Sequence, residues 1–463
     1  MGRPRADLGL KEDLALISER VVTPEGVAPA AIHIRRGTIA GIGPPESLPD
    51  VPSLDVGSSV VMPALIDTHV HVDEPGRTDW EGFASATRAA AAGGITTIVD
   101  MPLNCIPPTT TVEALECKEE AASQQCWVDV GFWGGLVPDN LGGLADLFQA
   151  GVLGFKAFLV HSGVDEFPPV SEEVLRTAMP ELTRLGAPLL VHAELPEALQ
   201  DAGQAQGDWT HYLTYLATRP AEAEDQAVEL LIALCRQLGT RVHVLHLSSA
   251  SALRPLARAR REGLPISAET CPHYLALSAE DVPDGATEFK CGPPIRDRQN
   301  RDGLWDGLHR GVIDLVVSDH SPSPPALKRR ESGRFDLAWG GISSLQLSLP
   351  ATWSSARHRG HSLEDLAEWM CAGPARLAGL QHRKGRIAPG YDADLVVWDP
   401  EATFLVEPEK LEHRHPVSAY ADRILYGVVN RTLLRGAMIY ECGNFPGSPK
   451  GKLLERETVG KKT

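Results

Sequence analysis

The sequence lacks the features that mark secreted, membrane-spanning and nucleic-acid-binding proteins. Its eight cysteines are spread over 463 residues without a Cys-x-x-Cys pair, which favours free thiols in a reducing compartment over a disulfide framework. No apolar run approaches the roughly 20 residues of a membrane span, and the first residues, MGRPRADLGLKEDLALISER, hold no apolar core of signal-peptide length. A formal net charge of −17 disfavours nucleic acid and anionic membranes as partners. We therefore expect a cytoplasmic protein, with peroxisomal or mitochondrial association as alternatives.

Two further patterns are missing, and both narrow the choice of fold. There is no internal repeat, and no Gly-x-Gly-x-x-Gly follows the first expected barrel strand, so a doubly wound open sheet is the weaker alternative. With 463 residues, 43% of them hydrophobic, the chain exceeds one ordinary domain. A large domain with a smaller one beside it is expected.

The middle of the chain alternates short apolar runs with longer helical patterns. Helical patterns such as 171–186 and 224–239 end at glycine, a common helix stop. Eight apolar runs separated by helices predict an α/β fold whose parallel sheet closes into a (β/α)8 TIM-like barrel. The expected strands span 60–72, 94–101, 128–135, 151–160, 188–194, 241–248, 265–271 and 313–321.

The two ends of the chain carry strand-like runs of a different kind. Residues 14–43 near the start, and 385–400 with 425–440 near the end, alternate short apolar runs with turn signals. Neither end alone holds enough strands for a stable sheet, so we expect both to pair in one small β-sandwich domain. The expected boundaries are 1–59 and 385–442 for the β-sandwich domain, 60–384 for the barrel, and 443–463 for a flexible tail.

Ionisable residues stand near the carboxyl ends of several expected strands. Any single one has an ordinary explanation: a strand histidine is more often a hydrogen-bonded core residue, a lysine snorkels to the surface, and an aspartate caps a loop. Even the histidine pair in LIDTHVHVDEPG (65–76) leaves core residues and metal ligands equally open. Together, however, these residues would meet at the face where barrel active sites lie, and burying them without a shared cation is unfavourable. The set comprises His69, His71, Lys156, His192, His246 and Asp319.

The residue types in this set indicate a metal centre. Four imidazoles and a carboxylate suit zinc or a similar divalent ion, and they exceed one tetrahedral shell, so two metals are expected. Lys156 is the exception, because an ammonium repels cations. Its apolar neighbours in GFKAFL favour a neutral amine, which reaction with carbon dioxide would convert into an anionic carbamate bridge.

The motifs around these residues resemble those of the cyclic amidohydrolase branch of the amidohydrolase superfamily, over roughly residues 14–440. They are DTHVHVDEPGRTDWEGF, AAAAGGITTIVDMPLNCIPPTTT, GFKAFL, LLVHAE, VLHLSSA, AETCPHYL, KCGPPIRD, VVSDHSP and PGYDADLVVWD. The resemblance implies a barrel with a composite β-sandwich, a homotetramer, and two divalent ions, Zn2+ first with Co2+, Mn2+ or Fe2+ as alternatives.

The resemblance also implies a division of labour among the ionisable residues. It assigns the more buried metal to His69 and His71, with Asp319 completing its shell. It assigns the second metal to His192 and His246, and the bridge between the metals to carboxylated Lys156. Our mechanistic hypothesis is that a metal-bridging hydroxide attacks a ring amide while Asp319 takes its proton and delivers it to the departing nitrogen.

Two positions separate the members of this branch. Dihydroorotases usually carry Arg where this chain has Asp73, and hydantoinases usually carry Tyr where it has His161. EPGRTDWEGF, DMPLNCIPPTT and the KCGPP around Cys291 resemble allantoinases instead, which implies hydrolysis of the cyclic amide of allantoin to allantoate in purine catabolism. Allantoinases commonly have Asn at the position of Asp73 and often Cys at that of Ser323, so two departures are noted. The alternatives are a hydantoinase or dihydropyrimidinase and a catalytically inactive scaffold paralogue.

Substrate contacts follow from the same resemblance. They are expected at Asn104, Cys291, Gly292 and Gly341, although turn geometry explains the glycines equally well. Segment 322–340 is either a lid or a plain surface loop. His243, three residues before His246, is expected to face away from the metals.

Overall fold

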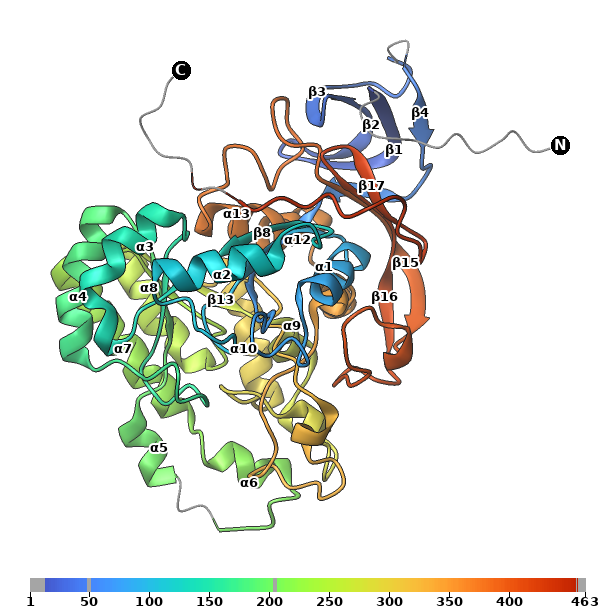
Figure 1. The fold of residues 1–463 in the computed structure, drawn as a ribbon. Helices are drawn as coiled ribbons and strands as arrows, with labels where there is room; N and C mark the ends of the chain where they lie inside the picture. The colour runs from blue at the N-terminus through green and yellow to red at the C-terminus, as the bar shows by residue number, and fades with distance from the viewer. Residues whose placement is uncertain (1–12, 48–50, 203–205, 455, 457–463) are drawn as a thin grey trace.

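The protein consists of a ring of parallel strands wrapped in helices, with a smaller sheet beside it (Figure 1). The computed structural model describes residues 13–47, 51–202, 206–454 and 456. The ring strands are β6 (Leu65–Val70), β7 (Ile95–Asp100), β8 (Asp129–Phe132), β9 (Gly134–Gly135), β10 (Phe155–Phe158), β11 (Leu189–His192), β12 (Val242–Val244), β13 (Ile266–Thr270) and β14 (Leu315–Val316).

The ring closes on itself. β6, β7 and β8 pair in parallel, as do β9 to β14 in chain order. β8 and β9 are two parts of one strand position in the ring, separated by Trp133. The Trp133 N–H donates to the carbonyl of Asp100 in β7 over 3.0 Å. On the other side Val70 forms a parallel bridge with His320, and the His71 N–H donates to the His320 carbonyl over 2.9 Å. The expected (β/α)8 barrel is therefore confirmed.

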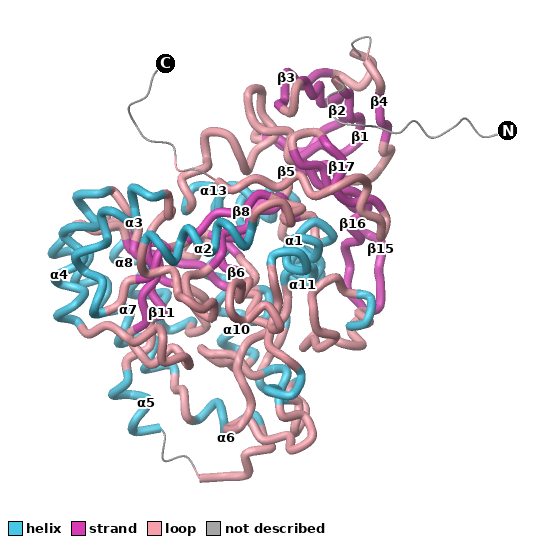
Figure 2. Tube along the Cα trace, viewed as in Figure 1, coloured by secondary structure: helices cyan, strands magenta, loops and turns pink. Residues whose placement is uncertain are grey.

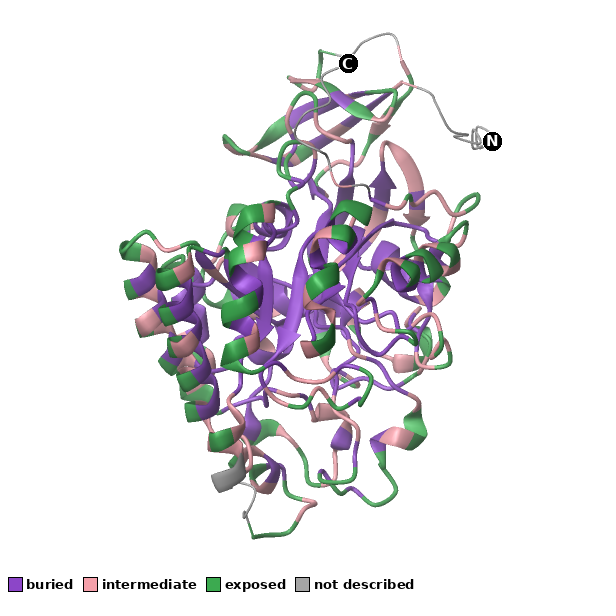
Figure 3. Cartoon of the chain, turned by 60° about the vertical axis from the view of Figure 1, so that its left-hand side comes forward, coloured by how far each residue is buried: buried purple, intermediate pink, exposed green. Residues whose placement is uncertain are grey.

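Helices cover the outside of the ring, and the buried strands fill the middle (Figures 2 and 3). α4 shows why they begin and end where they do: Ser171 caps it by accepting the Val174 N–H, and Gly186, at φ 70°, ends it. The helices are α1 (Phe83–Ala92), α2 (Val112–Ala122), α3 (Leu144–Ala150), α4 (Glu172–Leu185), α5 (Pro196–Ala202), α6 (Tyr212–Ala217), α7 (Ala221–Leu238), α8 (Leu253–Arg261), α9 (Pro272–Ala276), α10 (Arg298–His309), α11 (Ser348–His358), α12 (Leu363–Ala367) and α13 (Gly373–Leu377).

The smaller sheet is built from both ends of the chain, as expected. Its strand order is β17-β16-β15-β5-β1-β2-β3, with β4 paired to β1. The strands are β1 (Leu14–Thr23), β2 (Gly26–Arg35), β3 (Thr38–Gly43), β4 (Ser53–Asp55), β5 (Val60–Pro63), β15 (Leu395–Leu405), β16 (Ile424–Leu434) and β17 (Ala437–Glu441). β5 pairs on one side with β1 and on the other with β15, so it joins the strands from the two ends of the sequence.

The expected strand at 60–72 is in fact two strands. β5 pairs with β1 and β15 in the smaller sheet, whereas β6 pairs with β7 in the barrel. The change occurs at Pro63 and Ala64: proline has no N–H for a barrel ladder, and the Ala64 N–H donates to Asp394 over 2.9 Å. The change of partner strand could not be predicted from the sequence, because both strands are fully buried and the apolar run is continuous across them.

A buried cluster of charges joins the smaller sheet to the barrel. Asp129 at the start of β8 accepts from Lys384 Nζ over 2.9 Å and from Arg435 Nη1 over 2.6 Å, and Lys384 also contacts Asp394. Buried charges are tolerated when they are paired in this way, so the cluster fixes how the two sheets meet.

The segment after β17, expected to be a flexible tail, is ordered as far as it is described. The Gly451 N–H donates to the Cys126 carbonyl, the Leu454 N–H donates to Val130, and Leu454 is buried. Leu454 thus docks on the hydrophobic core beside β8, and the expected flexible tail over 443–463 stays a prediction; residues 455 and 457–463 lie outside the described part. Within the described residues, none of the helices combines the length and apolar character that crossing a membrane requires.

Candidate metal centre

The strand-end residues singled out from the sequence meet at the carboxyl end of the barrel. His69 and His71 lie at the end of β6, Lys156 in β10, and His192 at the end of β11. His246 and Asp319 follow β12 and β14, where positive φ angles of 33° and 44° turn the chain inward. All six side chains are buried, in the position that barrel enzymes use for catalysis.

Three of the ligand candidates form one tight group. Oδ1 of Asp319 lies 3.2 Å from Nε2 of His69 and 3.6 Å from Nε2 of His71. Their potential ligand atoms all lie within 4.8 Å of one another. Nζ of Lys156 lies 3.4 Å from Nε2 of His69, so the lysine borders this group.

The other two histidines form a second group next to it. Nδ1 of His192 faces Nε2 of His246 across 3.0 Å. The rings of His69 and His246 are 5.2 Å apart between centroids. The two groups are therefore neighbours at the carboxyl ends of the barrel strands, and Nζ of Lys156 borders the first of them.

The protonation chemistry of these groups fits divalent cations. Burial lowers the pKa of His69, His71 and His246 well below the usual value, so their imidazoles are neutral and present lone pairs. Burial also raises the pKa of Asp319 to about 7. Neutral imidazoles and a carboxylate that converge in a buried space match the donor set of zinc and related ions.

Lys156 is buried without a carboxylate within 4.0 Å of its Nζ in the described part of the chain, in contrast to Lys118, which pairs with Asp100 at 2.6 Å. Burial lowers the pKa of Lys156 to about 8. Nζ also lies 4.8 Å from the centroid of the Phe158 ring. At a pKa of about 8, on the order of a tenth of this amine is neutral at pH 7, far more than for an exposed lysine.

A buried carboxylate that sequence reasoning missed orients the first histidine. Glu269 in β13 contacts Nδ1 of His69 at 2.5 Å and Nε2 of His243 at 2.9 Å. Nδ1 of His243 in turn contacts the Ser267 hydroxyl at 2.7 Å. With Glu269 accepting from Nδ1–H, the Nε2 lone pair of His69 is directed at the Asp319 group. An acid inside the apolar strand 265–271 was the available signal.

The same contacts correct the expectation for His243. It does not face away from the candidate metal ligands but bonds to Glu269, which contacts His69. The alternation of side chains fails to carry over to His246 because β12 ends at Val244 and His246 has a positive φ of 33°.

A second carboxylate orients His192. Oε2 of Glu194 lies 2.7 Å from Nε2 of His192, and Oε1 accepts from Nε of Arg219 over 3.1 Å. The side chain of Glu194 is completely buried. In each histidine group, a glutamate therefore contacts one ring nitrogen of a histidine. Such a contact fixes the tautomer of a metal-binding imidazole.

We expect Glu269→Gln to lower the affinity for divalent metal by about 10- to 100-fold, because the amide cannot accept from both imidazoles. Competition with a fluorescent chelator during metal loading measures the change. Ser267→Ala, two hydrogen bonds further from His69 than Glu269, serves as the graded control and has the smaller effect. Equal metal affinity in Glu269→Gln and the unmodified protein would contradict this orienting role.

The residues expected to contact the substrate lie in loops near the carboxyl end of the barrel. Nδ2 of Asn104 is 3.4 Å from Nδ1 of His71. The Cys291 carbonyl accepts from the Tyr215 hydroxyl over 2.7 Å, and a Cβ on Gly292 would come within 3.5 Å of Arg219. Asn104 thus contacts one of the candidate metal ligands directly.

Gly341 has a backbone reason to be glycine. Its φ is 122°, and a Cβ would lie 2.2 Å from the Ser321 carbonyl oxygen. Its N–H donates to the Lys290 carbonyl over 2.7 Å, which ties the loop after β14 to the loop that carries Cys291. Turn geometry and close approach therefore account for Gly341 without a substrate contact.

Segment 322–340 follows β14 and packs against the loop that follows β6. The Trp339 ring meets Trp80 edge-on at 5.1 Å, and the buried Lys328 ammonium donates to the Trp339 carbonyl over 3.3 Å. His161, at the position of the hydantoinase tyrosine, is 57% exposed and pairs with Asp165. The loop thus contributes an aromatic wall, while His161 faces solvent.

Asp73, two residues after His71, is buried. It has a positive φ of 67°, and neither carboxylate oxygen bonds to a described residue. Burial, together with Asp100 and Glu81, raises the pKa of Asp73 well above its usual value. A protonated Asp73 would carry both a hydrogen-bond donor and an acceptor, as an asparagine side chain does.

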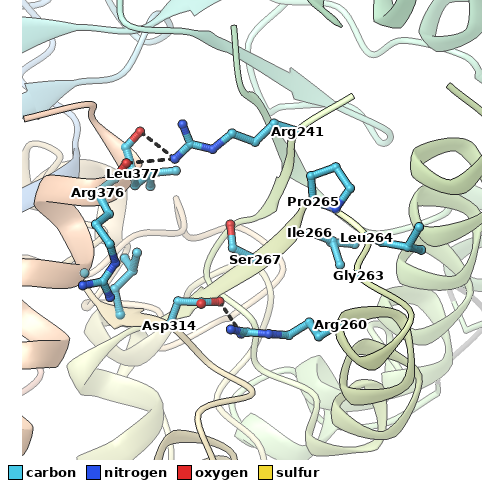
Figure 4. Close-up of a pocket in the computed structure, with 12 residues that line it drawn as sticks. Arg241, Arg260, Gly263, Leu264, Pro265, Ile266, Ser267, Asp314, Arg376 and Leu377 are labelled. Carbon is cyan, nitrogen blue, oxygen red and sulfur yellow. Dashed lines mark hydrogen bonds and ion pairs between the residues drawn. The ribbon is translucent and has the colours of Figure 1, made fainter. Parts of the chain in front are cut away.

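A cavity of about 450 Å3 lies elsewhere, at the start of β12, β13 and β14 (Figure 4). Arg260 spans it to donate to Asp314 over 2.8 Å, and Arg241 donates to the Arg376 carbonyl over 2.9 Å. These residues precede the strands, whereas the candidate metal ligands follow them. The cavity is therefore separate from the site described above.

The sequence matches the amidohydrolase family over residues 60–439. It is 54% identical to the allantoinase of Streptomyces avermitilis over 449 residues, which cover 96% of this chain and 99% of that protein. It is 45% identical to the allantoinase of Arabidopsis thaliana, with 94% and 90% covered. Among solved structures, the L-hydantoinase (dihydropyrimidinase) of Arthrobacter aurescens superimposes with a TM-score of 0.90 at 30% identity, covering 96% of this chain and all of that one.

Proposed function

We propose that this chain, which belongs to the amidohydrolase family, hydrolyses the ring amide of allantoin to give allantoate. The convergence of four imidazoles, Asp319 and Lys156 on one buried cavity is the observation that supports hydrolysis. The choice of allantoin rests on the identity of 45–54% to allantoinases over most of the chain. These relatives extend over bacteria, plants and yeast.

The residues present fit a pair of divalent cations. His69, His71 and Asp319 would hold one ion, and His192 with His246 the other, with carboxylated Lys156 between them. We propose Zn2+, with Co2+, Mn2+ or Fe2+ as alternatives, because all four accept this donor set. Such ions supply Lewis-acid chemistry, which polarises the amide carbonyl and lowers the pKa of water.

Asp319 is the proposed proton carrier. Its carboxylate removes a proton from the attacking water and delivers it to the ring nitrogen as the C–N bond breaks. The Ser321 hydroxyl donates to Oδ1 of Asp319 over 2.9 Å and keeps the carboxylate oriented. This position, beside both His69 and His71, lets one group serve both proton transfers.

Lys156 is proposed to act as a carbamate rather than as an ammonium. The neutral amine adds to carbon dioxide, a new N–C bond forms, and one proton leaves to solvent. The product carries one negative charge and two oxygen donors in place of a cation. Burial and the absence of an ion pair within the described residues favour this reaction.

A substrate panel tests the proposed function. We expect kcat/KM for allantoin to exceed that for hydantoin, dihydrouracil and dihydroorotate by at least about 100-fold, because a site that hydrogen-bonds ureido groups discriminates against rings that lack them. Metal-loaded protein and a colorimetric or chromatographic assay suffice. A wide preference for dihydrouracil or hydantoin would instead support the hydantoinase alternative, which the similar solved structures favour.

A scaffold protein without activity is the remaining alternative. Every residue that the resemblance assigns to the metals is present and buried in the cavity, which argues against that role. Binding of about two equivalents of divalent ion is expected of the enzyme and not of the scaffold. Assembly as a homotetramer and a cytoplasmic location stay predictions.

A further inference from the structure

A third group of ligand atoms adjoins the candidate metal centre. Cys271, His273 and Asp319 each offer an atom within 4.8 Å of the other two. Cys271 follows β13, His273 lies in the first turn of α9, and Asp319 follows β14. The exposed fraction is 0% for both Cys271 and His273.

His273 gives this group its significance. Neither ring nitrogen of His273 has a hydrogen-bond partner among the described residues, although the side chain is completely buried. Its ring contacts Tyr274 edge-on at 4.2 Å between centroids. Burying a polar ring without a hydrogen-bond partner is unfavourable, and coordination of a cation would offset that cost.

The chemistry of the donors indicates which cation they suit. A thiolate, an imidazole and a carboxylate together form a softer set than the imidazoles and carboxylate of the main group. Zinc and cadmium accept such mixed sulfur, nitrogen and oxygen ligands in a tetrahedral arrangement, with a water completing the shell.

We propose that Cys271, His273 and Asp319 form an additional site for a thiophilic divalent cation of the Zn2+ or Cd2+ type. Binding replaces the S–H bond of Cys271 by a metal–sulfur bond and releases the proton to solvent. Asp319 is shared with the main group, so an ion in the additional site withdraws its carboxylate from proton transfer. Excess zinc is therefore inhibitory, a consequence that rests on the role proposed above for Asp319.

Cadmium titration of the metal-loaded protein tests the site without relying on turnover. We expect about one further equivalent to bind and to produce a thiolate-to-cadmium charge-transfer band in the ultraviolet. Cys271→Ser removes the band, and the matched control Cys235→Ser, another buried thiol, retains it. His273→Gln keeps the thiol and lowers the affinity for the additional ion by at least about 10-fold, which provides an answer if Cys271→Ser fails to fold.

The activity measurement is separate. Inhibition by excess Zn2+ in the unmodified protein is expected to need at least about 10-fold more ion in His273→Gln. A band that persists in Cys271→Ser, or saturation at two equivalents without a band, would overturn the additional site. A band in a protein that does not hydrolyse allantoin would sink the proposed function and leave the site standing.

Discussion

Lys156→Ala is expected to lower kcat for allantoin by roughly 10^3-fold or more. The substitution removes the proposed carbamate between the two histidine groups, and loss of several kcal/mol of charge stabilisation corresponds to that factor. Because alanine leaves space where the buried Lys156 side chain was, added acetate or propionate is expected to enter and restore part of the activity. Turnover with and without added acid measures both effects.

Lys156→Met is the matched control for this rescue. Methionine has a similar length and lacks the amine, so it fills the space and leaves no room for an added acid. We expect the same loss of activity without recovery. Full activity of untreated Lys156→Ala would exclude the bridge, and rescue of both variants would show that the acid acts elsewhere.

Asp319→Asn is expected to lower kcat by about 10^3-fold, within the range for removal of a general acid–base group. KM should change little, because the amide keeps the size and polarity of the carboxylate. In the unmodified protein the carboxylate form is required, so activity is present above the pKa of Asp319 and is lost as pH falls through it. Burial, partly offset by Lys156 and the Ser321 hydroxyl, raises this pKa to about 7; bound divalent cations would lower it, so the acidic limb should lie at or below pH 7.

The control for Asp319 uses its hydrogen-bond partner. The Ser321 hydroxyl donates to Oδ1 over 2.9 Å and lowers the pKa of Asp319. Ser321→Ala is therefore expected to move the acidic limb to higher pH while most of kcat is retained. A pH profile that is identical in the two proteins, or an unchanged kcat in Asp319→Asn, would argue against Asp319 as the proton carrier.

The barrel could be predicted because its strands are short, apolar and separated by capped helices. β7, β11 and β13 all lie inside the expected runs. The change of partner at Pro63 could not be predicted, since β5 and β6 are equally hydrophobic and only tertiary pairing distinguishes them. The docking of Leu454 could not be predicted for a related reason: the Gly, Pro and Lys composition of its segment hides a single residue that docks beside β8.

The site shows the same division between local pattern and three-dimensional context. His69, His71 and His192 stand at strand ends, where period-two alternation and the carboxyl face of the barrel can be read from the sequence. Glu269 could not be recognised from its spacing, because it meets His69 from a strand 200 residues away in the chain. His273 lies in α9, and its lack of a hydrogen-bond partner among the described residues depends on tertiary packing that the sequence does not reveal.

The order of strands in the smaller sheet has a consequence for synthesis on the ribosome. β5 is made early, but its neighbour β15 belongs to the last part of the chain. At about 5–20 residues per second, the edge of β5 waits on the order of half a minute with unpaired backbone groups, a state that invites wrong pairing between nascent chains. The smaller sheet is therefore completed only after the barrel strands have been synthesised.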